Sequence, residues 1–444
     1  MTGKNCKYQI TTLGCKVNQC ESEALAHHLS QSGWNSSQAD DQVNVCIINT
    51  CTVTQKASMQ SRQAIRQAVR ANPDALIIVT GCYAQTEPDA IRKIQGVDYI
   101  IGNSDKHNIP RILSGSLEAP ASATCQCHDI STERRFQPLP DISIGTRTRP
   151  FLKIQDGCNN FCTYCIVPFA RGRSRSMPPE DVLSQIRKLK QSGYREVVLT
   201  GIHLGCYGLD LSPDTSLLSL IRRIEESGCI DRVRLSSIEP HELSPDIIRL
   251  VSVSEMFCRH FHIPLQSGDD RILKRMHRPY TRSFFKNLVF QIHELMPDAA
   301  IGVDTLIGFP GENPEAFENT YSLIQELPVS YLHVFPFSSR KNTPAARFPD
   351  KVPPGEIKNR CRLMRELGNR KKTRFLENLV GTQTRILVEE KTDTKTGLMK
   401  GMSSNYIPVL FTGEDHFKNK IITVRLDRIT KNSQVFGSRI DPRM

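Results

Sequence analysis

Three cysteines within eight residues constrain this chain more than any other feature of its sequence. Cys158, Cys162 and Cys165 have the spacing C-x-x-x-C-x-x-C and follow an apolar, strand-like run from Phe151 to Ile154. Neither a regular helix nor a strand can point three thiols with this spacing at one spot, so we expect a loop wrapped around a metal. Soft thiolate ligands select zinc, copper(I) or iron–sulfur clusters.

The number of ligands in this loop separates the candidate metals. A structural zinc site takes four ligands, and the loop supplies three cysteines and no histidine. A 4Fe–4S cluster is normally held by four cysteines, so three would leave one iron open to a substrate or cofactor. A zinc loop with a distant fourth ligand and three unrelated buried cysteines are the alternatives. The spacing favours the open 4Fe–4S cluster over both.

Length and composition set the broad class. The 444 residues are enough for two or three domains. No run is apolar for the length that a membrane span needs, and Met1 to Ile10 lacks a secretory pattern. The 15 cysteines therefore predict a cytoplasmic protein in which thiols are metal ligands or buried side chains rather than disulfides. A net charge of +12 indicates a polyanionic partner.

The first hundred residues alternate between strand and helix patterns. Strands are predicted at 8–13, 43–48 and 76–79, and helices at 21–31 and 55–71. This βαβαβ alternation predicts an open parallel sheet with right-handed crossovers.

Cys15, Cys51 and Cys82 each stand just after one of these predicted strands. In open α/β sheets, ligands bind beyond the carboxyl ends of the strands. The three thiols are therefore expected to meet at one sheet edge and to hold a second cluster. Buried cysteines at strand ends are also common without any metal, and that is the alternative.

Residues 109–149 lose this periodicity and are rich in Ser, Ala and Pro, which predicts a connector between domains. Cys125 and Cys127 form a C-x-C within it, and with no partner ligands nearby we interpret them as incidental thiols.

The central part of the chain repeats a strand–helix unit six times. Strands are predicted at 151–155, 196–200, 232–237, 260–264, 301–307 and 331–335, and helices at 179–191, 216–226, 244–253, 281–295 and 313–326. Six β/α repeats predict a partial barrel, open on one side, with its site at the carboxyl ends of the strands. From about residue 379 short alternating strands predict a small all-β barrel of the oligonucleotide-binding kind.

Two basic stretches flank the central repeats. Arg171, Arg173 and Arg175 follow the cysteine loop and are predicted to face the mouth of the site, where they would contact RNA phosphates. Residues 356–374 hold eight Lys or Arg against two Glu, which predicts either a second RNA-binding face or a solvated helix face.

Several motifs resemble one family. C-x-x-x-C-x-aromatic-C, with Tyr164 as the aromatic residue, resembles the cluster motif of the radical S-adenosylmethionine (SAM) superfamily. In that superfamily the open iron chelates the methionine end of SAM, and reductive cleavage yields a 5′-deoxyadenosyl radical. The longer stretch FLKIQDGCNNFCTYCIVPFARGRSRS resembles the methylthiotransferase branch.

The resemblance extends along the whole chain. TLGCKVNQCESE, NTCTVT and TGCYAQ resemble the three motifs of the methylthiotransferase N-terminal domain, whose cysteines bind an auxiliary 4Fe–4S cluster. The C-terminal segment resembles a TRAM domain, which in this family binds tRNA. The implied organisation is an N-terminal domain at 1–108, a linker at 109–149, a radical SAM domain at 150–378 and a TRAM domain at 379–441.

Residues in the cysteine loop and at or just after the ends of the predicted strands are candidates to contact SAM, and the sequences there resemble those of methylthiotransferases. These residues are Tyr164, Thr200, Gly201, Ser236, Ser237, Glu239 and Gln266. Each one alone is also explained by ordinary turn chemistry. His203 and His262 are expected to be hydrogen-bonded walls of the site. No side chain is expected to act as a catalytic base, because the cofactors carry the chemistry.

Within the family, the motifs resemble most the branch acting on N6-threonylcarbamoyladenosine. The implied reaction adds a methylthio group to carbon 2 of that nucleoside, next to the anticodon of tRNA. Two 4Fe–4S clusters, SAM, a sulfur source and an electron donor such as flavodoxin or ferredoxin are implied. The alternatives are the sister enzymes for isopentenyladenosine in tRNA or a ribosomal-protein aspartate, and a non-catalytic iron–sulfur regulator that binds RNA.

Overall fold

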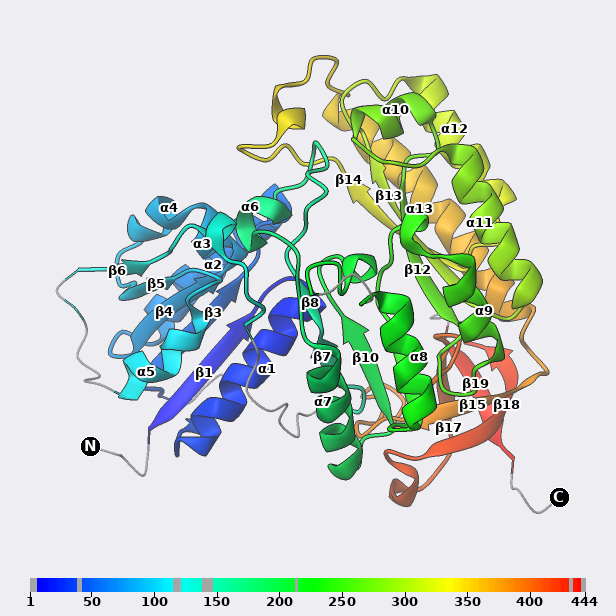
Figure 1. Ribbon diagram of the computed structural model, residues 1–444, viewed down its shortest axis with the longest axis horizontal. Coiled ribbons are helices and arrows are strands. Elements are labelled where there is room, and N and C mark those ends of the chain that lie inside the picture. The colour runs from blue at the N-terminus through cyan, green and yellow to red at the C-terminus, as the bar shows by residue number, and fades with distance from the viewer. Residues whose placement is uncertain are drawn as a thin grey trace. The chain divides into compact units, whose positions relative to one another are not determined.

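A computed structural model describes residues 6–37, 42–114, 120, 122–137, 147–211, 215–430 and 434–440 (Figure 1). The chain forms two compact units. Unit 1 comprises Met1–Gly145, Phe151–Met177 and Ser338–Ala346, and unit 2 comprises Thr146–Pro150, Pro178–Phe337 and Arg347–Met444. The cysteine loop thus belongs to the same unit as the N-terminal residues, which differs from the predicted boundary at residue 150.

Unit 1 is built on a parallel sheet, as predicted. Its strands among the described residues run in the order β2-β1-β3-β4-β5-β6. They are β1 (Lys7–Thr12), β2 (Asn35–Ser36), β3 (Val45–Thr50), β4 (Leu76–Gly81), β5 (Tyr99–Ile101) and β6 (Thr124–Gln126). β3 and β4 are buried along their whole length, as expected of parallel strands covered on both faces.

Helices cover both faces of this sheet. They are α1 (Lys16–Gln31), α2 (Gln55–Ala71), α3 (Cys82–Thr86), α4 (Pro88–Arg92) and α5 (Ile109–Ser114). α1 and α5 pack in one apolar core, and α2, α3 and α4 pack in the other (Figure 1). α1 begins at Lys16, five residues before the predicted start, because Cys15 has the extended backbone of an N-cap.

The interdomain connector predicted at 109–149 contains regular structure in its first part, which the sequence pattern did not indicate. α5 lies within it, and β6 adds to the sheet edge by pairing with β5. Cys125 is in β6, and Cys127 packs against the same apolar core as α2. β6 is three residues long and has no apolar alternation, so its sequence carried no strand signal. Residues 138–146 lie outside the described residues.

The segment around the cysteine loop folds into unit 1. It contains β7 (Phe151–Lys153), β8 (Gln155–Asp156), α6 (Val167–Arg171) and β9 (Arg175–Ser176). β8 and β9 pair antiparallel, so they join the two ends of the loop. A Cβ on Gly157, whose φ is +76°, would lie 1.9 Å from the Arg173 carbonyl oxygen, so this neck requires glycine.

Unit 2 contains the other predicted strands of the central repeats. They are β10 (Glu196–Thr200), β11 (Arg232–Leu235), β12 (His260–Gln266), β13 (Ala300–Ile307) and β14 (Tyr331–Pro336). β10 pairs with β11, and β12, β13 and β14 pair in that order, all parallel. The helices are α7 (Pro179–Gln191), α8 (Leu217–Ser227), α9 (Pro245–Val253), α10 (Asp270–Arg275), α11 (Arg282–Leu295), α12 (Pro314–Glu326) and α13 (Pro354–Glu377). The predicted β/α alternation is confirmed.

The predicted C-terminal barrel is also present in unit 2. It is closed in the order β15-β16-β17-β19-β18, from β15 (Gln383–Val388), β16 (Met399–Ser403), β17 (Pro408–Phe411), β18 (Ile421–Ile429) and β19 (Val435–Arg439). Arg232 and Arg234 of β11 donate hydrogen bonds to backbone carbonyls of Arg385 and Ser403, so the barrel is tied to the central strands.

Short 3₁₀ turns complete the chain at Lys106–Asn108 (η1), Ile130–Thr132 (η2), Leu204–Cys206 (η3), Pro240–Glu242 (η4), Pro344–Arg347 (η5) and Asp415–Phe417 (η6). Among the described residues, no helix is both long and apolar enough to cross a bilayer.

Candidate functional site: two groups of cysteines in one unit

The three strand-end cysteines come together because β1, β3 and β4 are neighbours in the sheet. The register pairs Thr12 with Asn49 and Thr50 with Gly81, which brings the three strand ends level. Cys15, Cys51 and Cys82 are the residues that follow these ends. A Cβ on Gly14 would lie 2.9 Å from Cys51 Sγ, so glycine there lets the two turns approach closely.

Electrostatic coupling confirms that these thiols are near one another. Burial raises the pKa of Cys51, and the charges of Cys82 and Cys15 act in the same direction, which gives a pKa of about 11. Burial also raises the pKa of Cys15, against the opposing effect of Arg171 and with a further increase from Cys82. Metal ligation requires deprotonated thiols, so metal binding at this edge would release protons.

Arg171 is the cation at the centre of this site. Its Nε donates to Cys82 Sγ at 3.4 Å, and its side chain is 1% exposed. Its guanidinium also pairs with Glu21 of α1 and lies 3.3 Å from Asp156 of β8. Through Arg171, the segment that carries the cysteine loop is joined to the strand-end cysteines.

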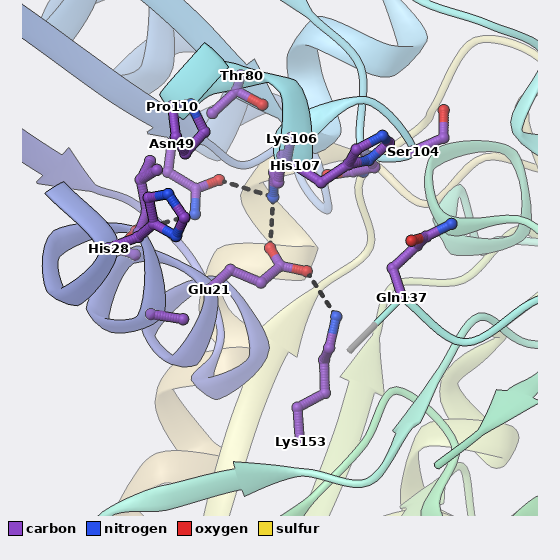
Figure 2. Close-up of a pocket in the computed structure, with 14 residues that line it drawn as sticks. Glu21, His28, Asn49, Thr80, Ser104, Lys106, His107, Pro110, Gln137 and Lys153 are labelled. Atoms are coloured by element: carbon purple, nitrogen blue, oxygen red, sulfur yellow. Dashed lines mark hydrogen bonds and ion pairs between the residues drawn. The ribbon is translucent and has the colours of Figure 1, made fainter. Parts of the chain in front are cut away.

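Glu21 is held between three cations. Besides Arg171, Lys106 Nζ donates to its Oε2 and Lys153 Nζ lies 3.3 Å from its Oε1 (Figure 2). Burial alone would raise the pKa of Glu21, but the charges of Arg171, Lys106 and Lys153 outweigh burial and hold this pKa well below its usual range. Glu21 is therefore an ionised carboxylate inside the protein.

Among the described residues, the ion-pair cluster beside the strand-end cysteines holds more cations than anions. Its cations are Lys106, Lys153, Arg171 and Arg175, and the anions paired with them are Glu21 and Asp156. Uncompensated buried charge is costly. Three cysteine thiolates on an iron–sulfur cluster would supply the missing negative charge, and Arg171 would donate a hydrogen bond to one of them. The donor set at this edge therefore fits a 4Fe–4S cluster.

Two of the three arginines predicted to contact RNA, Arg171 and Arg175, are buried in this structure. Arg175 is 4% exposed, and its Nη2 donates to the Arg171 carbonyl oxygen at 3.0 Å. Both side chains are turned toward the buried carboxylates because ion pairing replaces the hydration they lose. Of the three predicted arginines only Arg173 is exposed.

The C-x-x-x-C-x-x-C loop is a series of tight turns. The N–H of Cys165 donates to the Cys162 carbonyl oxygen at 2.9 Å, and the N–H of Asn160 lies 3.5 Å from Cys158 Sγ. Phe161 has φ +43° and packs edge-on against Phe169, at a ring distance of 6.0 Å. Backbone N–H groups directed at sulfur suit a thiolate-bound cluster, so the donor set here also fits.

The residues predicted to contact SAM in unit 2 lie at the carboxyl ends of adjacent strands. Thr200 ends β10, and Ser236 follows β11 with a buried Oγ that has no hydrogen-bond partner among the described residues. Ser237 Oγ lies 3.1 Å from His262 Nδ1, and Glu239 forms an ion pair with Arg278. Glu239 therefore already has a cationic partner.

Gln266, the last of the predicted residues in unit 2, has φ +66° at an irregularity of the β12–β13 pairing. Gly201 follows Thr200 directly and is half-buried. Tyr164 is half-buried in the cysteine loop of unit 1. SAM contacts by Gln266, Gly201 and Tyr164 remain predictions.

A polar chain inside unit 2 was not predicted from the sequence. Asp304 of β13 lies 2.7 Å from His262 Nε2 of β12 and 3.2 Å from His333 Nδ1 of β14. Burial would raise the pKa of Asp304, but the hydrogen bonds and charges of the two histidines hold it at about 2. Only the expectation that His262 is hydrogen-bonded is confirmed. The one sequence signal for Asp304 was a carboxylate in the middle of an apolar strand.

His203, the other expected wall residue, is also hydrogen-bonded. Its Nε2 lies 2.8 Å from Glu242 Oε1, and it is 4% exposed. Glu242 and the nearby Cys206 were not predicted as members of this group.

Two family models match the chain in the order of its parts. The model described as uncharacterized protein family UPF0004 matches residues 7–102, and that of the radical SAM superfamily matches residues 152–324. These ranges contain the strand-end cysteines and the cysteine loop respectively.

Curated relatives match over nearly the full length. The threonylcarbamoyladenosine tRNA methylthiotransferase MtaB of Bacillus subtilis is 38% identical, over 94% of this chain and 92% of its own. The chain belongs to the radical SAM methylthiotransferase family. The MtaB of Aquifex aeolicus is also 38% identical, over 91% of this chain and 96% of its own. The tRNA-2-methylthio-N(6)-dimethylallyladenosine synthase of Pelotomaculum thermopropionicum is 34% identical, over 94% of both chains.

Solved structures agree with this methylthiotransferase in fold. The radical S-adenosylmethionine methyltransferase TsrM of Kitasatospora setae has a TM-score of 0.55 at 14% identity and covers 74% of this chain and 72% of its own. At this identity the likeness concerns the fold alone.

Proposed function

We propose that this methylthiotransferase adds a methylthio group to carbon 2 of N6-threonylcarbamoyladenosine in tRNA. The observation that carries the proposal is the presence of both cysteine groups in one compact unit, linked through Arg171. The names of the relatives that are 38% identical over most of the chain support this nucleoside. Cys158, Cys162 and Cys165 would hold one 4Fe–4S cluster, and Cys15, Cys51 and Cys82 would hold the other.

The chemistry of the substrate explains why two metal sites are needed. Carbon 2 of the adenine ring carries an unreactive C–H, which acid–base catalysis at neutral pH cannot remove. When bound, SAM and the clusters supply a radical for that C–H and an iron that keeps sulfur ready nearby. A one-electron donor such as flavodoxin or ferredoxin, and a source of sulfur, are then required partners.

The protein residues position these groups and exclude water. Asp156 stands two residues before Cys158 and pairs with Arg171, whose Nε contacts Cys82. This buried chain of contacts fixes the cysteine loop against the strand-end cysteines. Because the site must hold its reacting groups within ångströms, we assign Arg171, Glu21 and Asp156 a positioning role.

The tRNA substrate is a polyanion, and both units offer cations to it. In unit 1 Arg173 is exposed beside the cysteine loop. In unit 2 the exposed side chains of α13 include Arg362, Arg370 and Arg374. The closed C-terminal barrel has the topology of small barrels that bind single-stranded nucleic acid.

The decisive experiment compares tRNA substrates. Anaerobically reconstituted protein would be incubated with SAM, reductant, sulfide and tRNA carrying either N6-threonylcarbamoyladenosine or N6-dimethylallyladenosine. Mass spectrometry of the digested nucleosides should show the 2-methylthio product only from the first tRNA. Product from the dimethylallyl tRNA alone would instead assign to this chain the activity named for the relative that is 34% identical, a tRNA-2-methylthio-N(6)-dimethylallyladenosine synthase. Absence of both products, with SAM still cleaved, would refute the proposal.

A further inference from the structure

A cavity of about 290 Å³ lies inside unit 1. It is enclosed by α1, by the ends of β3 and β4, and by the loop from Asn103 to Pro110 (Figure 2). None of the roles assigned above uses this space. Its volume suits a small molecule or a few ordered waters rather than a nucleotide.

The cavity lies directly behind the strand-end cysteines. Asn49 and Thr80 line it, and each stands two residues before a cysteine of the site, Cys51 and Cys82. Asn103 lines it as well, and its Nδ2 lies 3.7 Å from Cys82 Sγ. One side chain, that of Asn103, therefore touches both the cavity and a proposed cluster ligand.

Two buried polar atoms of the lining residues have no hydrogen-bond partner. Across the part of the chain that the structure describes, neither Thr80 Oγ1 nor Asn103 Oδ1 is bonded, and Thr80 is 1% exposed. Leaving a buried hydroxyl or amide unpaired is unfavourable. One is a hydroxyl that can donate and the other a carbonyl oxygen that accepts, so a ligand that reached both atoms would have to accept one hydrogen bond and donate another.

The charges of the lining favour an anion. Lys106 and Lys153 reach Glu21 from two sides (Figure 2). Glu21 is also paired with Arg171. Lys106 Nζ has two hydrogen-bond partners among the described residues, Glu21 and Asn49, which leaves one of its three protons. This third proton is available to an anionic ligand.

Part of the lining is apolar. Ala24 and Leu25 of α1 and Pro110 of α5 form that side. A sulfur anion is large, polarisable and weakly hydrated, so it tolerates apolar contacts better than a small oxyanion of the same charge. A hydrosulfide ion also carries an S–H for Asn103 Oδ1, and the anionic persulfide of an amino acid carries an ammonium N–H.

We propose that this cavity holds the sulfur donor, a small sulfur-bearing anion, before its sulfur reaches the edge of the sheet at Cys82. The inference rests on the proposed function, which consumes one sulfur atom for each methylthio group formed. It adds a binding site to that function, separate from the cysteines themselves. Asn103 then forms the wall between the waiting donor and the strand-end cysteines.

The test measures how sulfide binds to cluster-loaded protein. The probe is sodium hydrosulfide, and the readouts are sulfide-dependent thermal stabilisation without tRNA and the KM for sulfide in tRNA methylthiolation. Thr80→Val keeps the shape and removes the hydroxyl, and Ala24→Leu fills part of the cavity. His27→Leu is the matched control, because His27 is next to the cavity residue His28 on α1 but does not line the cavity.

Thr80→Val should raise the KM for sulfide about tenfold, as loss of a hydrogen bond to a charged ligand does. Ala24→Leu should raise this KM by about the same factor, because the larger side chain fills part of the cavity. Saturating sulfide should restore kcat, and both variants should lose sulfide-dependent thermal stabilisation. The control should match the unmodified protein in both readouts. Iron content and the electron paramagnetic resonance (EPR) spectrum show whether each variant keeps its clusters.

The two sources of sulfur are separated by a second arm with cysteine persulfide. KM changes with both donors support free hydrosulfide as the occupant, and changes with persulfide alone support an amino-acid-sized donor. Unchanged KM and thermal stabilisation in Thr80→Val and Ala24→Leu, for both donors, would overturn the inference. Sulfide-dependent thermal stabilisation is measured without tRNA. It therefore tests sulfide binding in the cavity even if the protein does not methylthiolate the proposed tRNA nucleoside.

Discussion

Arg171 Nε lies 3.4 Å from Cys82 Sγ, although the two residues stand 89 positions apart in the chain. Arg171 closely follows the cysteine loop, and Cys82 is one of the strand-end cysteines. This hydrogen bond joins the segment that carries the cysteine loop to one of the strand-end cysteines. Its consequences can be tested one residue at a time.

Arg171→Gln should lower both the stability of the protein and the reduction potential of the cluster at the strand-end cysteines. The variant removes the buried cation that pairs with both Glu21 and Asp156, and breaking such a buried pair costs about 3–5 kcal/mol. Loss of a hydrogen bond to a thiolate also lowers the reduction potential of the bound cluster. Potentiometric EPR titration and urea unfolding measure the two effects. Arg173 is exposed, so Arg173→Gln should change neither the reduction potential nor the free energy of unfolding. Equal reduction potentials in the two variants would contradict the role of Arg171.

Replacing Cys158, Cys162 or Cys165 by Ala should abolish SAM cleavage, because three thiolates are the minimum that holds an open cluster. About four irons per chain should be lost, while the strand-end cluster remains. Chromatographic assay of 5′-deoxyadenosine and iron analysis measure these changes. Continued 5′-deoxyadenosine formation in these variants would refute the ligand assignment.

The triple variant Cys15→Ala, Cys51→Ala, Cys82→Ala should still cleave SAM but should not attach sulfur. It removes only the thiols at the sheet edge, so about four irons should again be lost. Cys46→Ala is the control, because Cys46 is a buried thiol in the middle of β3. Nucleoside mass spectrometry and iron analysis decide the outcome. A methylthio product from the triple variant would remove the second cluster from the proposal.

Arg173→Gln should weaken tRNA binding without affecting either cluster, since this is the exposed arginine beside the cysteine loop. If it contacts a phosphate, the slope of log Kd against log salt should fall by about 0.7 to 0.9. Filter binding at several salt concentrations measures this slope. An unchanged slope would place the RNA contacts of this unit elsewhere.

Asp304→Asn should lower stability in a pH-dependent way. The folded-state pKa of Asp304 is about 2, against 3.8 for a free side chain, because His262 and His333 overcome the effect of burial. The depressed pKa contributes about 2 kcal/mol, fully present above pH 4 and lost as pH falls toward 2. Urea unfolding of both proteins between pH 2 and 7 should show this convergence. A difference that is independent of pH would contradict it.

Much of the site was predictable because parallel sheets obey a local rule. Apolar runs such as Val45 to Ile48 and Leu76 to Val79 identify buried strands, and the residue after such a strand lies at the edge where ligands bind. Cys51 and Cys82 were placed in this way. The spacing of the cysteine loop likewise needed no knowledge of the fold.

Other features left no local signal. β6 is too short for a periodic pattern and forms because β5 offers it an unpaired edge. Its place in the sheet is therefore not indicated by the sequence pattern. The Asp304 chain of hydrogen bonds similarly requires three strands in register.

The sequence by itself determined which residues are the candidate cluster ligands: the six cysteines, their spacing and the strands that carry three of them. Only the tertiary structure decided what surrounds them. The basic stretch around Arg171 predicts a cation at the protein surface. In the structure Arg171 instead pairs inside the protein with Glu21, 150 residues away in the sequence. An ion pair between residues so far apart forms only when folding removes water from both. Which cations face solvent and which compensate a buried carboxylate is therefore a property of packing rather than of local sequence.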